Sequence, residues 1–254
     1  RSGGHSYAGA SRIEEGLLID MSRFTKLKVD KTAQSITFGV GQLLGGVYSK
    51  ARETQSFFAG GTCPGVGSGG YTLGGGYSAA SRLSGFIIDT MLSLRGITVS
   101  GESFFANSTV NSDLFWAMRG GGGTHAIATE FTVKTFPIYE NYVKCSFGWS
   151  KDDRGNVIKS FLRGQPWKLD PNVARITLIV ASGSASLNME QWGGISDAYM
   201  KSFLANASLP APSSSSCQNM TWDEFFLAMA QPSNLTWSDL STPKLRKSQY
   251  LGDT

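Results

Sequence analysis

Residues 60–77 read Gly-Gly-Thr-Cys-Pro-Gly-Val-Gly-Ser-Gly-Gly-Tyr-Thr-Leu-Gly-Gly-Gly-Tyr, and half of them are glycine. Such a run does not serve helix or strand stability, because glycine loses more backbone freedom on folding than any other residue. It suits a backbone that approaches a ligand closely, where rows of N–H groups bind anions. We therefore predict an anion-binding loop, typically for a pyrophosphate. Cys63 within it is either an attachment point or a small buried filler, and the loop alone favours neither.

Two further segments accompany this loop. Residues 1–9 read Arg-Ser-Gly-Gly-His-Ser-Tyr-Ala-Gly, and residues 113–123 read Asp-Leu-Phe-Trp-Ala-Met-Arg-Gly-Gly-Gly-Gly. In this order and spacing, the three segments resemble the flavin-binding family that includes vanillyl-alcohol oxidase. Within that family they resemble the berberine-bridge-enzyme-like branch, which also contains microbial carbohydrate oxidases. The resemblance extends over residues 1–137.

The resemblance implies a cofactor and the residues that hold it. In this branch a histidine is joined to the flavin 8α-methyl group and a cysteine to flavin C6, which implies bicovalent FAD on His5 and Cys63. Two such links fix the ring and change its redox potential. The expected cofactor-binding residues are Ser2, Gly3, Gly4, His5, Ser6, Gly61, Thr62, Cys63, Gly65, Val66, Gly67, Gly69, Gly70, Tyr71 and Gly75.

The resemblance also implies an α+β fold in two parts. A PCMH-type FAD-binding domain is expected over residues 1–138, and a substrate-binding domain of antiparallel sheet with helices on one face over residues 139–254. Family order places a strand before Arg1 and a closing segment after residue 254, so we expect a fragment of a longer protein. Alone, this fragment is expected neither to attach FAD nor to oxidise sugars, because unpaired sheet edges favour aggregation.

Hydrophobic patterns place the elements of the first domain. An amphipathic helix is expected over residues 42–54, and a second helix, capped by Asn111 or Ser112, over residues 115–118. The expected strands are residues 16–21 as a buried strand, residues 27–29 and 35–40 as a pair, residues 87–94, residues 97–99, and residues 127–133, closed by Pro137.

The second domain follows from the same patterns. Alternating apolar residues predict strands over residues 143–149 and 174–180. Helices are expected over residues 157–162, over residues 189–205 with Trp192, Ile195, Tyr199 and Phe203 on its apolar side, and after Thr221, which forms a capping box with Glu224. Residues 210–216, rich in Pro and Ser, are expected to form a loop.

The chain departs from the family pattern at several positions. Tyr71 stands where the family commonly has histidine, and a tyrosine donates one hydrogen bond without becoming cationic near neutral pH. Ser78 replaces a glycine and Thr90 an asparagine. His125 stands where the family has an aromatic residue, and we interpret it as structural. These changes imply either altered flavin reactivity or a degenerate copy.

The catalytic base is not assigned to any residue of this sequence. In the family it is a tyrosine that lies, by family order, beyond residue 254. Tyr199 and Tyr250 have no matching sequence context.

Two other kinds of site, for a nicotinamide dinucleotide and for a metal ion, can be compared with the sequence. Gly65, Gly67 and Gly70 fit the nicotinamide-dinucleotide fingerprint, with Asp89 at the expected distance. That fingerprint should directly follow a buried strand and open a helix, whereas a Cys-Pro pair precedes it here and a glycine run follows. His5, Cys63 and His125 match no zinc spacing, so no metal site is expected.

Composition limits the class of protein. Of the 254 residues 41% are hydrophobic and 17% charged, which is typical of a globular chain. The net charge of +4 is scattered, with no block of basic residues, so nucleic acid is not expected as a partner. No apolar run approaches the roughly 18 residues of a membrane span, so no membrane partner is expected.

Sequons and cysteines indicate the compartment. Asn-x-Ser/Thr triplets occur at Asn107, Asn206, Asn219 and Asn234, and four of them favour a secreted glycoprotein. If flavin takes Cys63, the two remaining cysteines, Cys145 and Cys217, either pair or stay as separate thiols; the sequence favours neither.

The expected function is that of a secreted oxidase. By the resemblance, a hydride passes from a substrate C–H bond to flavin N5, and dioxygen reoxidises the flavin and yields hydrogen peroxide. A mono- or oligosaccharide oxidised at its anomeric carbon is the first expected substrate, and a phenolic or alkaloid-like metabolite the second. The competing hypothesis is a catalytically dead secreted glycoprotein that keeps the fold.

Overall fold

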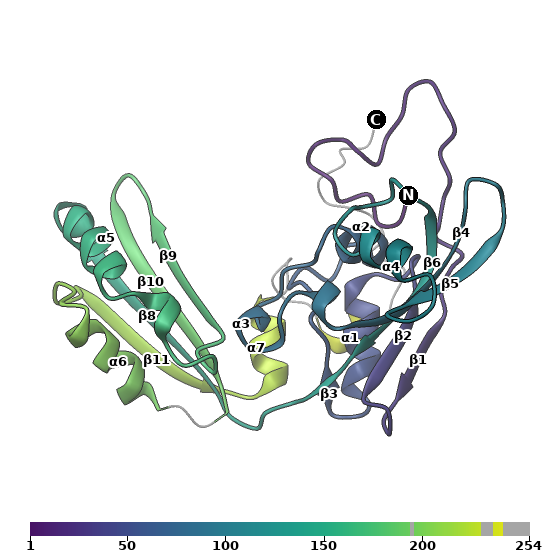
Figure 1. Ribbon diagram of the computed structural model, residues 1–254. Helices are drawn as coiled ribbons and strands as arrows, with labels where there is room; N and C mark the ends of the chain where they lie inside the picture. Colours follow the sequence, from purple (N-terminus) through teal and green to yellow (C-terminus); the bar gives the residue numbers. More distant parts are fainter. Residues whose placement is uncertain (194–195, 230–235, 241–254) are drawn as a thin grey trace. The chain divides into compact units, whose positions relative to one another are not determined.

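The computed structural model describes residues 1–193, 196–229 and 236–240 (Figure 1). The described chain divides into two compact units. The first unit comprises Arg1–Ala79, Ser84–Ile138 and the described residues from Phe226 onward, and the second comprises Ala80–Leu83 and Tyr139–Phe225. Both units combine helices with antiparallel strands, which confirms the predicted α+β class.

A five-stranded antiparallel sheet forms the first unit, in the order β1-β2-β6-β4-β5 (Figure 1). Its strands are β1 (Leu27–Asp30), β2 (Ser35–Gly39), β4 (Met91–Ile97), β5 (Ser103–Asn107) and β6 (Ile127–Lys134). Ile36, Phe38 and Phe131 are fully buried along β2 and β6. The predicted pair over residues 27–40 and the strand over residues 127–133 are therefore confirmed.

Helices and short strands complete this unit. Helix α1 (Leu44–Arg52) buries Leu44, Val47, Tyr48 and Ala51, as its spacing predicts. The remaining elements are β3 (Ser56–Phe57), α2 (Ser68–Leu73), α4 (Ser112–Ala117), β7 (Phe136–Pro137) and α8 (Trp237–Leu240). Helix α3 (Ser81–Ser84) lies where the chain passes between the units.

The predicted buried strand over residues 16–21 is wrong. Leu17 is 83% exposed and only Met21 of this stretch is buried. Its backbone forms no strand ladder: the Arg1 amino group donates to Ile19 O, Met21 N donates to Arg1 O, and Phe24 N donates to Met21 O within a turn. An apolar run without a neighbouring strand among the described residues has no sheet in which to be buried.

Two boundaries in this unit also differ from prediction. Residues 87–89 form a single 3₁₀ turn (Ile87–Asp89) and not a strand, because Asp89 accepts a hydrogen bond from Phe86 N at 2.8 Å and Thr90 donates to Ile87 O at 2.7 Å. Such local side-chain bonds compete with a sheet ladder. Helix α4 is confirmed, but Asn111 does not cap it by its side chain, which donates to Phe105 O at 2.7 Å.

The second unit is a four-stranded antiparallel sheet, in the order β11-β8-β10-β9, with α5 and α6 on one face (Figure 1). Its elements are β8 (Tyr142–Ser150), α5 (Arg154–Arg163), β9 (Arg175–Val180), β10 (Ser184–Trp192), α6 (Asp197–Asn206) and β11 (Ser214–Met220), with 3₁₀ turns at Lys151–Asp153 and Pro166–Lys168. Helix α7 (Trp222–Met229) begins in this unit and ends in the first. Phe147, Leu187 and Met200 belong to the core between sheet and helices. This confirms the predicted sheet with helices on one face.

The predicted helix over residues 189–205 is wrong in its first half. Residues up to Trp192 belong to β10, which pairs with β8 on one side and β9 on the other. Ala185, Leu187 and Met189 alternate into the core at the period of a strand, and two neighbouring ladders override the helical spacing. Helix α6 begins only at Asp197; Ile195 lies outside the described residues.

The loop predicted over residues 210–216 is shorter than expected, because β11 already begins at Ser214. The capping box of α7 is confirmed. Glu224 N donates to Thr221 Oγ1 at 3.2 Å, and Thr221 N donates to Glu224 Oε2 at 2.8 Å.

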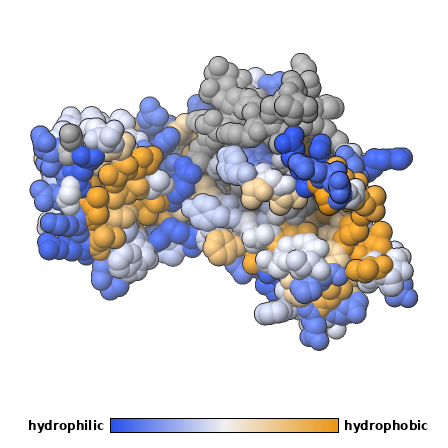
Figure 2. Space-filling model, turned by 90° about the horizontal axis from the view of Figure 1, so that it is seen from above, coloured by the Kyte–Doolittle hydropathy of each residue, from blue (hydrophilic) through white to orange (hydrophobic). Residues whose placement is uncertain are grey.

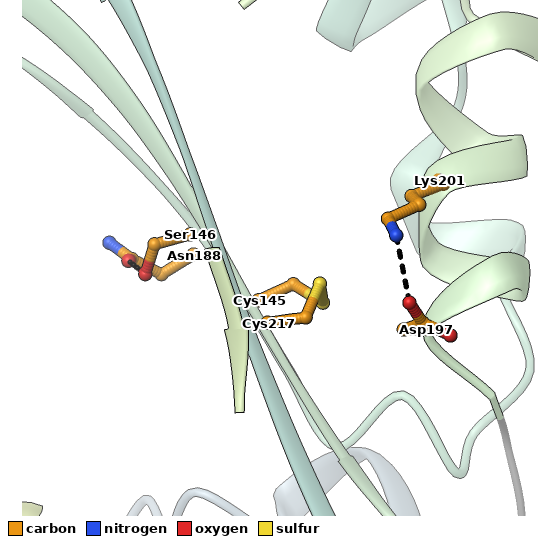
Figure 3. The surroundings of a disulfide bond; sticks show 6 residues. All are labelled: Cys145, Ser146, Asn188, Asp197, Lys201 and Cys217. Atoms are coloured by element: carbon orange, nitrogen blue, oxygen red, sulfur yellow. Dashed lines mark hydrogen bonds and ion pairs between the residues drawn. A yellow bond between two sulfur atoms is a disulfide. The ribbon is translucent and has the colours of Figure 1, made fainter. Parts of the chain in front are cut away.

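A disulfide joins Cys145 of β8 to Cys217 of β11 (Figure 3). The two residues are direct partners in the strand register. This settles the alternative that the sequence left open, and Cys63 is left as a free thiol.

Surface properties complete the description. Figure 2 shows apolar side chains gathered in a patch on the second unit, at the left of the view, within a mostly hydrophilic surface. Among the described residues, every helix is too short or too polar to span a lipid bilayer.

Candidate functional site

The N-terminal loop, residues 1–6, and the cysteine loop, residues 61–70, pack backbone against backbone. A Cβ added to Gly3 would lie 2.5 Å from Gly67 N, and a Cβ added to Gly67 would overlap Gly3 N. Only glycine at both positions permits this approach. The structure therefore brings together the two loops that the sequence assigned to one ligand.

Ser2 ties the two loops to the sheet of the first unit. Its hydroxyl donates to Val40 O at 2.5 Å and accepts from Gly69 N at 3.4 Å. The sequence predicts Ser2 only as a cofactor-binding residue, whereas in the structure its side chain holds the two loops in place.

The first turn of α1 holds the cysteine loop from the other side. Leu44 N donates to Val66 O at 2.9 Å, Gly45 N donates to Pro64 O at 3.0 Å, and Ser68 N donates to Gln42 O at 2.9 Å. The orphan N–H groups at the start of a helix need such partners. The sequence does not predict this contact, because the spacing of apolar residues in α1 does not indicate which loop packs against its first turn.

Two tyrosines hold the glycine run in place through hydrogen bonds from their hydroxyl groups. Tyr48 of α1, which is buried, donates to Gly60 O at 2.5 Å. The Tyr71 hydroxyl lies 3.0 Å from Ala59 O and 2.8 Å from Tyr77 O, and it donates its one proton within the loop. Burial, and secondarily the neighbouring Tyr77, raises the pKa of Tyr71 well above its usual range. Tyr71 therefore stays neutral at physiological pH, and its hydroxyl lies within hydrogen-bonding distance of carbonyl groups on both sides of the glycine run.

The two loops present a row of unused donors. Within the part of the chain that the structure describes, several backbone N–H groups donate no hydrogen bond to the protein. They belong to Gly3, Gly4, Gly61, Thr62, Cys63 and Gly65. Converging N–H groups in irregular backbone form anion-binding concavities. The residues present thus fit a phosphate-containing cofactor such as FAD, and we call these two loops the cradle.

The two expected attachment residues lie on the cradle. His5 and Cys63 are both partly exposed, and Cys63 is unpaired by any disulfide. The His5 ring lies 5.9 Å from the ring of Tyr7, between centroids. Partial exposure leaves both side chains accessible to a ligand, as covalent attachment requires.

The remaining expected residues occupy various positions. Gly4 (φ +76°) and Gly75 (φ +106°) adopt backbone conformations that favour glycine, and the Ser6 hydroxyl accepts from Ala10 N at 3.3 Å. Gly70 is exposed and faces open space. Of the departures from the family pattern, Ser78 and Thr90 are buried and His125 is exposed.

The two competing sites find no support in this geometry. Every strand pairing among the described residues is antiparallel, whereas a dinucleotide fold of the nicotinamide type needs a parallel sheet. Asp89 accepts a hydrogen bond within its own turn. No cluster of three or more metal-binding side chains occurs in the described part of the chain.

Known proteins resemble this chain over the segment that carries the cradle. A family model described as an FAD binding domain matches residues 1–106. The xylooligosaccharide oxidase of Thermothelomyces thermophilus is 33% identical over 173 residues, which is 67% of this chain and 35% of that protein. Berberine bridge enzyme-like 21 of Arabidopsis thaliana is 36% identical over 145 residues, 55% of this chain and 27% of that protein.

A solved structure extends the match to the second unit. The structure of Physcomitrella patens BBE-like 1 superimposes with a TM-score of 0.80 at 27% identity, covering 95% of this chain and 54% of that one. The chain is a homologue of berberine-bridge-enzyme-like proteins and carbohydrate oxidases and carries an FAD binding domain. The berberine-bridge-like resemblance and the PCMH-type fold predicted from the sequence are thereby confirmed. This berberine-bridge-like chain spans about a third of the curated relatives it matches, so the activity of the whole protein is a matter for proposal.

Proposed function

We propose that the whole protein is an FAD-linked oxidase of a mono- or oligosaccharide. The observation that carries the proposal is the backbone contact of Gly3 with Gly67, which places two loops of unused N–H donors side by side. The similarity to a protein named xylooligosaccharide oxidase favours a carbohydrate over a phenolic or alkaloid-like substrate.

The chain's residues would hold the cofactor in a defined way. The N–H groups of Gly3, Gly4 and Gly65 bind the diphosphate, because an anion satisfies donors that the protein leaves free. His5 and Cys63 supply the two covalent links, and residues 1–138 form most of the FAD-binding domain. When bound, FAD accepts a hydride from the substrate and returns the electrons to dioxygen, which gives hydrogen peroxide.

Residues 139–254 would form most of the substrate-binding domain. A sheet with one face covered by helices leaves its second face available for a ligand, and the side chains on that face set which ligand binds. No residue of this chain is assigned as the base that removes the substrate's hydroxyl proton.

We further propose secretion into an oxidising compartment. The disulfide between Cys145 and Cys217 supports this, because such bonds persist mainly outside the cytosol. Asn206 and Asn219 are exposed, as glycosylation requires, and Asn107 is partly so; Asn234 lies outside the described residues. Glycosidase treatment of protein from a eukaryotic host should reduce its apparent mass on a gel. Peptide mapping that finds all four asparagines unmodified would remove this support.

Peroxide release tests the activity. The purified whole protein is incubated with a panel of mono- and oligosaccharides and of phenolic alcohols, in air, and hydrogen peroxide is measured with a coupled peroxidase. We expect release with at least one saccharide and none with the same sugar reduced to its alditol, which lacks the anomeric C–H. A flavin-loaded protein that gives no peroxide with any member would support the catalytically dead alternative.

A further inference from the structure

A pocket of about 210 Å³ opens on the first unit, away from the cradle. Its walls come from the turn between β1 and β2, from the residues that join α1 to β3, and from β7. In Figure 1 the turn between β1 and β2 and strand β3 lie at the lower end of this unit, whereas α2, which continues from the cysteine loop, lies at its upper end. The pocket is therefore separate from the two loops that the article assigns to FAD.

Two glutamines that line this pocket have an unusual backbone conformation. Gln34 (φ +45°) and Gln55 (φ +53°) are two of the five non-glycine residues with positive φ in the described chain. Glutamine is not one of the residues that adopt this conformation readily, and such residues gather at ligand sites. Their carbonyl groups hold β7, since Gln34 O accepts from Thr135 N at 2.8 Å. Gln55 O likewise accepts from Ile138 N at 3.0 Å. Glycine would form both bonds with less strain, so the backbone does not explain why glutamine side chains stand here.

The side chains of these residues offer hydrogen-bond donors to the pocket. Gln34 and Gln55 are exposed, and their side-chain amides bond to no other residue in the described part of the chain. Each amide has two donor hydrogens and an acceptor oxygen. Lys31 lines the same pocket, and its ammonium group forms no ion pair with a described residue. None of the described residues that line the pocket is acidic. One cation and two amides favour a ligand with a carboxylate group.

The wall that follows α1 offers acceptors instead. Thr54 Oγ1 lies 2.9 Å from Ala51 O, Ser56 Oγ lies 3.0 Å from it, and the two hydroxyl oxygens are 2.9 Å apart. Each hydroxyl has a single proton, so this group of three oxygens takes up both protons and leaves hydroxyl lone pairs as acceptors. Phe136 adds a partly exposed aromatic ring, which packs against Phe57 with centroids 5.4 Å apart. A ligand that suits these groups carries hydroxyl groups as well as a carboxylate.

The volume of the pocket limits the size of the ligand. It equals about seven times the roughly 30 Å³ that one water molecule takes up in the liquid, and it is smaller than the pockets of about 300–1,000 Å³ that hold drug-sized ligands. An oligosaccharide or a dinucleotide is too large for it. An acid of the size of one monosaccharide fits.

We propose that this pocket binds a small hydroxycarboxylate, such as the acid of a single sugar. The Lys31 ammonium group pairs with the carboxylate, and the amides of Gln34 and Gln55 bond to its oxygens and to a neighbouring hydroxyl. The remaining hydroxyl groups donate to Thr54 and Ser56. This inference goes beyond the proposed function and does not depend on it.

Isothermal titration of the whole protein with D-xylonate tests the pocket. Xylitol, which has the hydroxyl groups without the carboxylate, is the matched ligand and should not bind. Lys31→Met should weaken xylonate binding by about tenfold or more, because a hydrogen bond between two charged groups is lost. Malate is titrated as a second hydroxy acid: tighter binding of xylonate identifies the ligand as a sugar acid, and tighter binding of malate as an acid from another source. The flavin absorbance spectrum should stay unchanged, since the pocket lies away from the cradle.

Glycine variants separate binding from folding. Gln34→Gly and Gln55→Gly should be at least as stable as the wild type in thermal unfolding, because glycine adopts positive φ without strain. Each should nevertheless weaken xylonate binding by about twofold to tenfold, the range for one hydrogen bond. Gln165→Gly is the matched control, because Gln165 is an exposed glutamine with φ +50° that does not line the pocket. It should leave xylonate affinity unchanged.

Three results would overturn the proposal. They are a wild-type protein that binds neither xylonate nor malate, binding that is equally strong in Lys31→Met and in both pocket glycine variants, and an equal loss of binding in Gln165→Gly. Each of them leaves the oxidase proposal intact, because peroxide release with saccharides is measured separately.

Discussion

The cradle of the first unit and the sheet of the second unit are held together by different parts of the polypeptide. The cradle consists of backbone N–H groups held by backbone contacts such as that of Gly3 with Gly67. The sheet of the second unit is held together by strand ladders and by buried side chains such as Phe147 and Leu187. A site made of backbone depends on the absence of side chains, so almost any substitution damages it. A fold held together by packed side chains tolerates exchanges between side chains of similar volume.

The first way to test this contrast is to add one carbon atom to the cradle. Gly67→Ala places a Cβ against Gly3 N and Ser2 Oγ, where backbone cannot yield. Overpacking of this kind costs about 3 kcal/mol or more, and we expect the whole protein to lose its flavin. Flavin absorbance per polypeptide measures the effect, and a fully flavin-loaded variant would contradict the backbone account.

Removing the disulfide should produce the next largest effect, in the second unit alone. Cys145→Ala with Cys217→Ala frees β11 from its covalent tie to β8. Loss of a native disulfide typically costs about 2–5 kcal/mol. The midpoint of urea unfolding should fall, and reduction of the wild-type protein should lower it equally. A midpoint that does not move would show that the strand ladder suffices.

Loss of the tyrosine hydroxyls should weaken the cradle moderately. Tyr48→Phe leaves Gly60 O without its buried donor, at a cost of about 1–3 kcal/mol. Tyr71→Phe removes a bond from a less buried position and should cost less. Thermal unfolding of both variants measures the difference.

The same tyrosines predict a pH dependence. Burial raises the pKa of Tyr48 and of Tyr71 above the ordinary value of 10.0. A folded-state pKa above the unfolded value means that the contribution is complete below about pH 10 and is lost as pH rises toward the folded pKa. Wild-type stability should therefore fall above pH 10, and less so in the double Phe variant. Identical alkaline profiles would contradict this assignment.

The smallest effect is expected from a glycine outside the cradle. Gly155 lies exposed in α5 with no atom near the position of an added Cβ. Gly155→Ala should raise stability by about 0.5–1 kcal/mol, since glycine is costly within a helix. Flavin content should not change. A loss of flavin as large as that expected for Gly67→Ala would show that replacing any glycine, and not only one in the cradle, removes the flavin.

The contrast also explains what could be predicted from the sequence. The cradle was predictable because a backbone site leaves a direct trace as glycine, and Gly3 and Gly67 both appear in the quoted motifs. The strand that contains Phe147, β8, could equally be predicted, because apolar residues alternate along it. The burial of Glu190 could not be predicted, because Asn188 and Glu190 resemble any exposed pair until β10 pairs with a strand on both sides. That pairing also replaced the first half of the helix predicted over residues 189–205.

The supports of the cradle could not be predicted for a related reason. Tyr48 fits the apolar spacing of α1, and its hydrogen bond to Gly60 O depends on a tertiary approach that no local pattern records. The apolar run over residues 16–21 indicated a buried strand, but burial depends on a neighbour that the run itself does not specify.

The most direct test of the account is peptide mapping of the denatured whole protein by mass spectrometry, for the wild type, His5→Ala, Cys63→Ala and the double variant. The account predicts one FAD that joins the peptide containing His5 to the peptide containing Cys63. Each single variant should keep FAD on the remaining residue, and the double variant should release it on denaturation. A wild-type protein that releases all its flavin when denatured, or that carries it on neither His5 nor Cys63, would contradict the account.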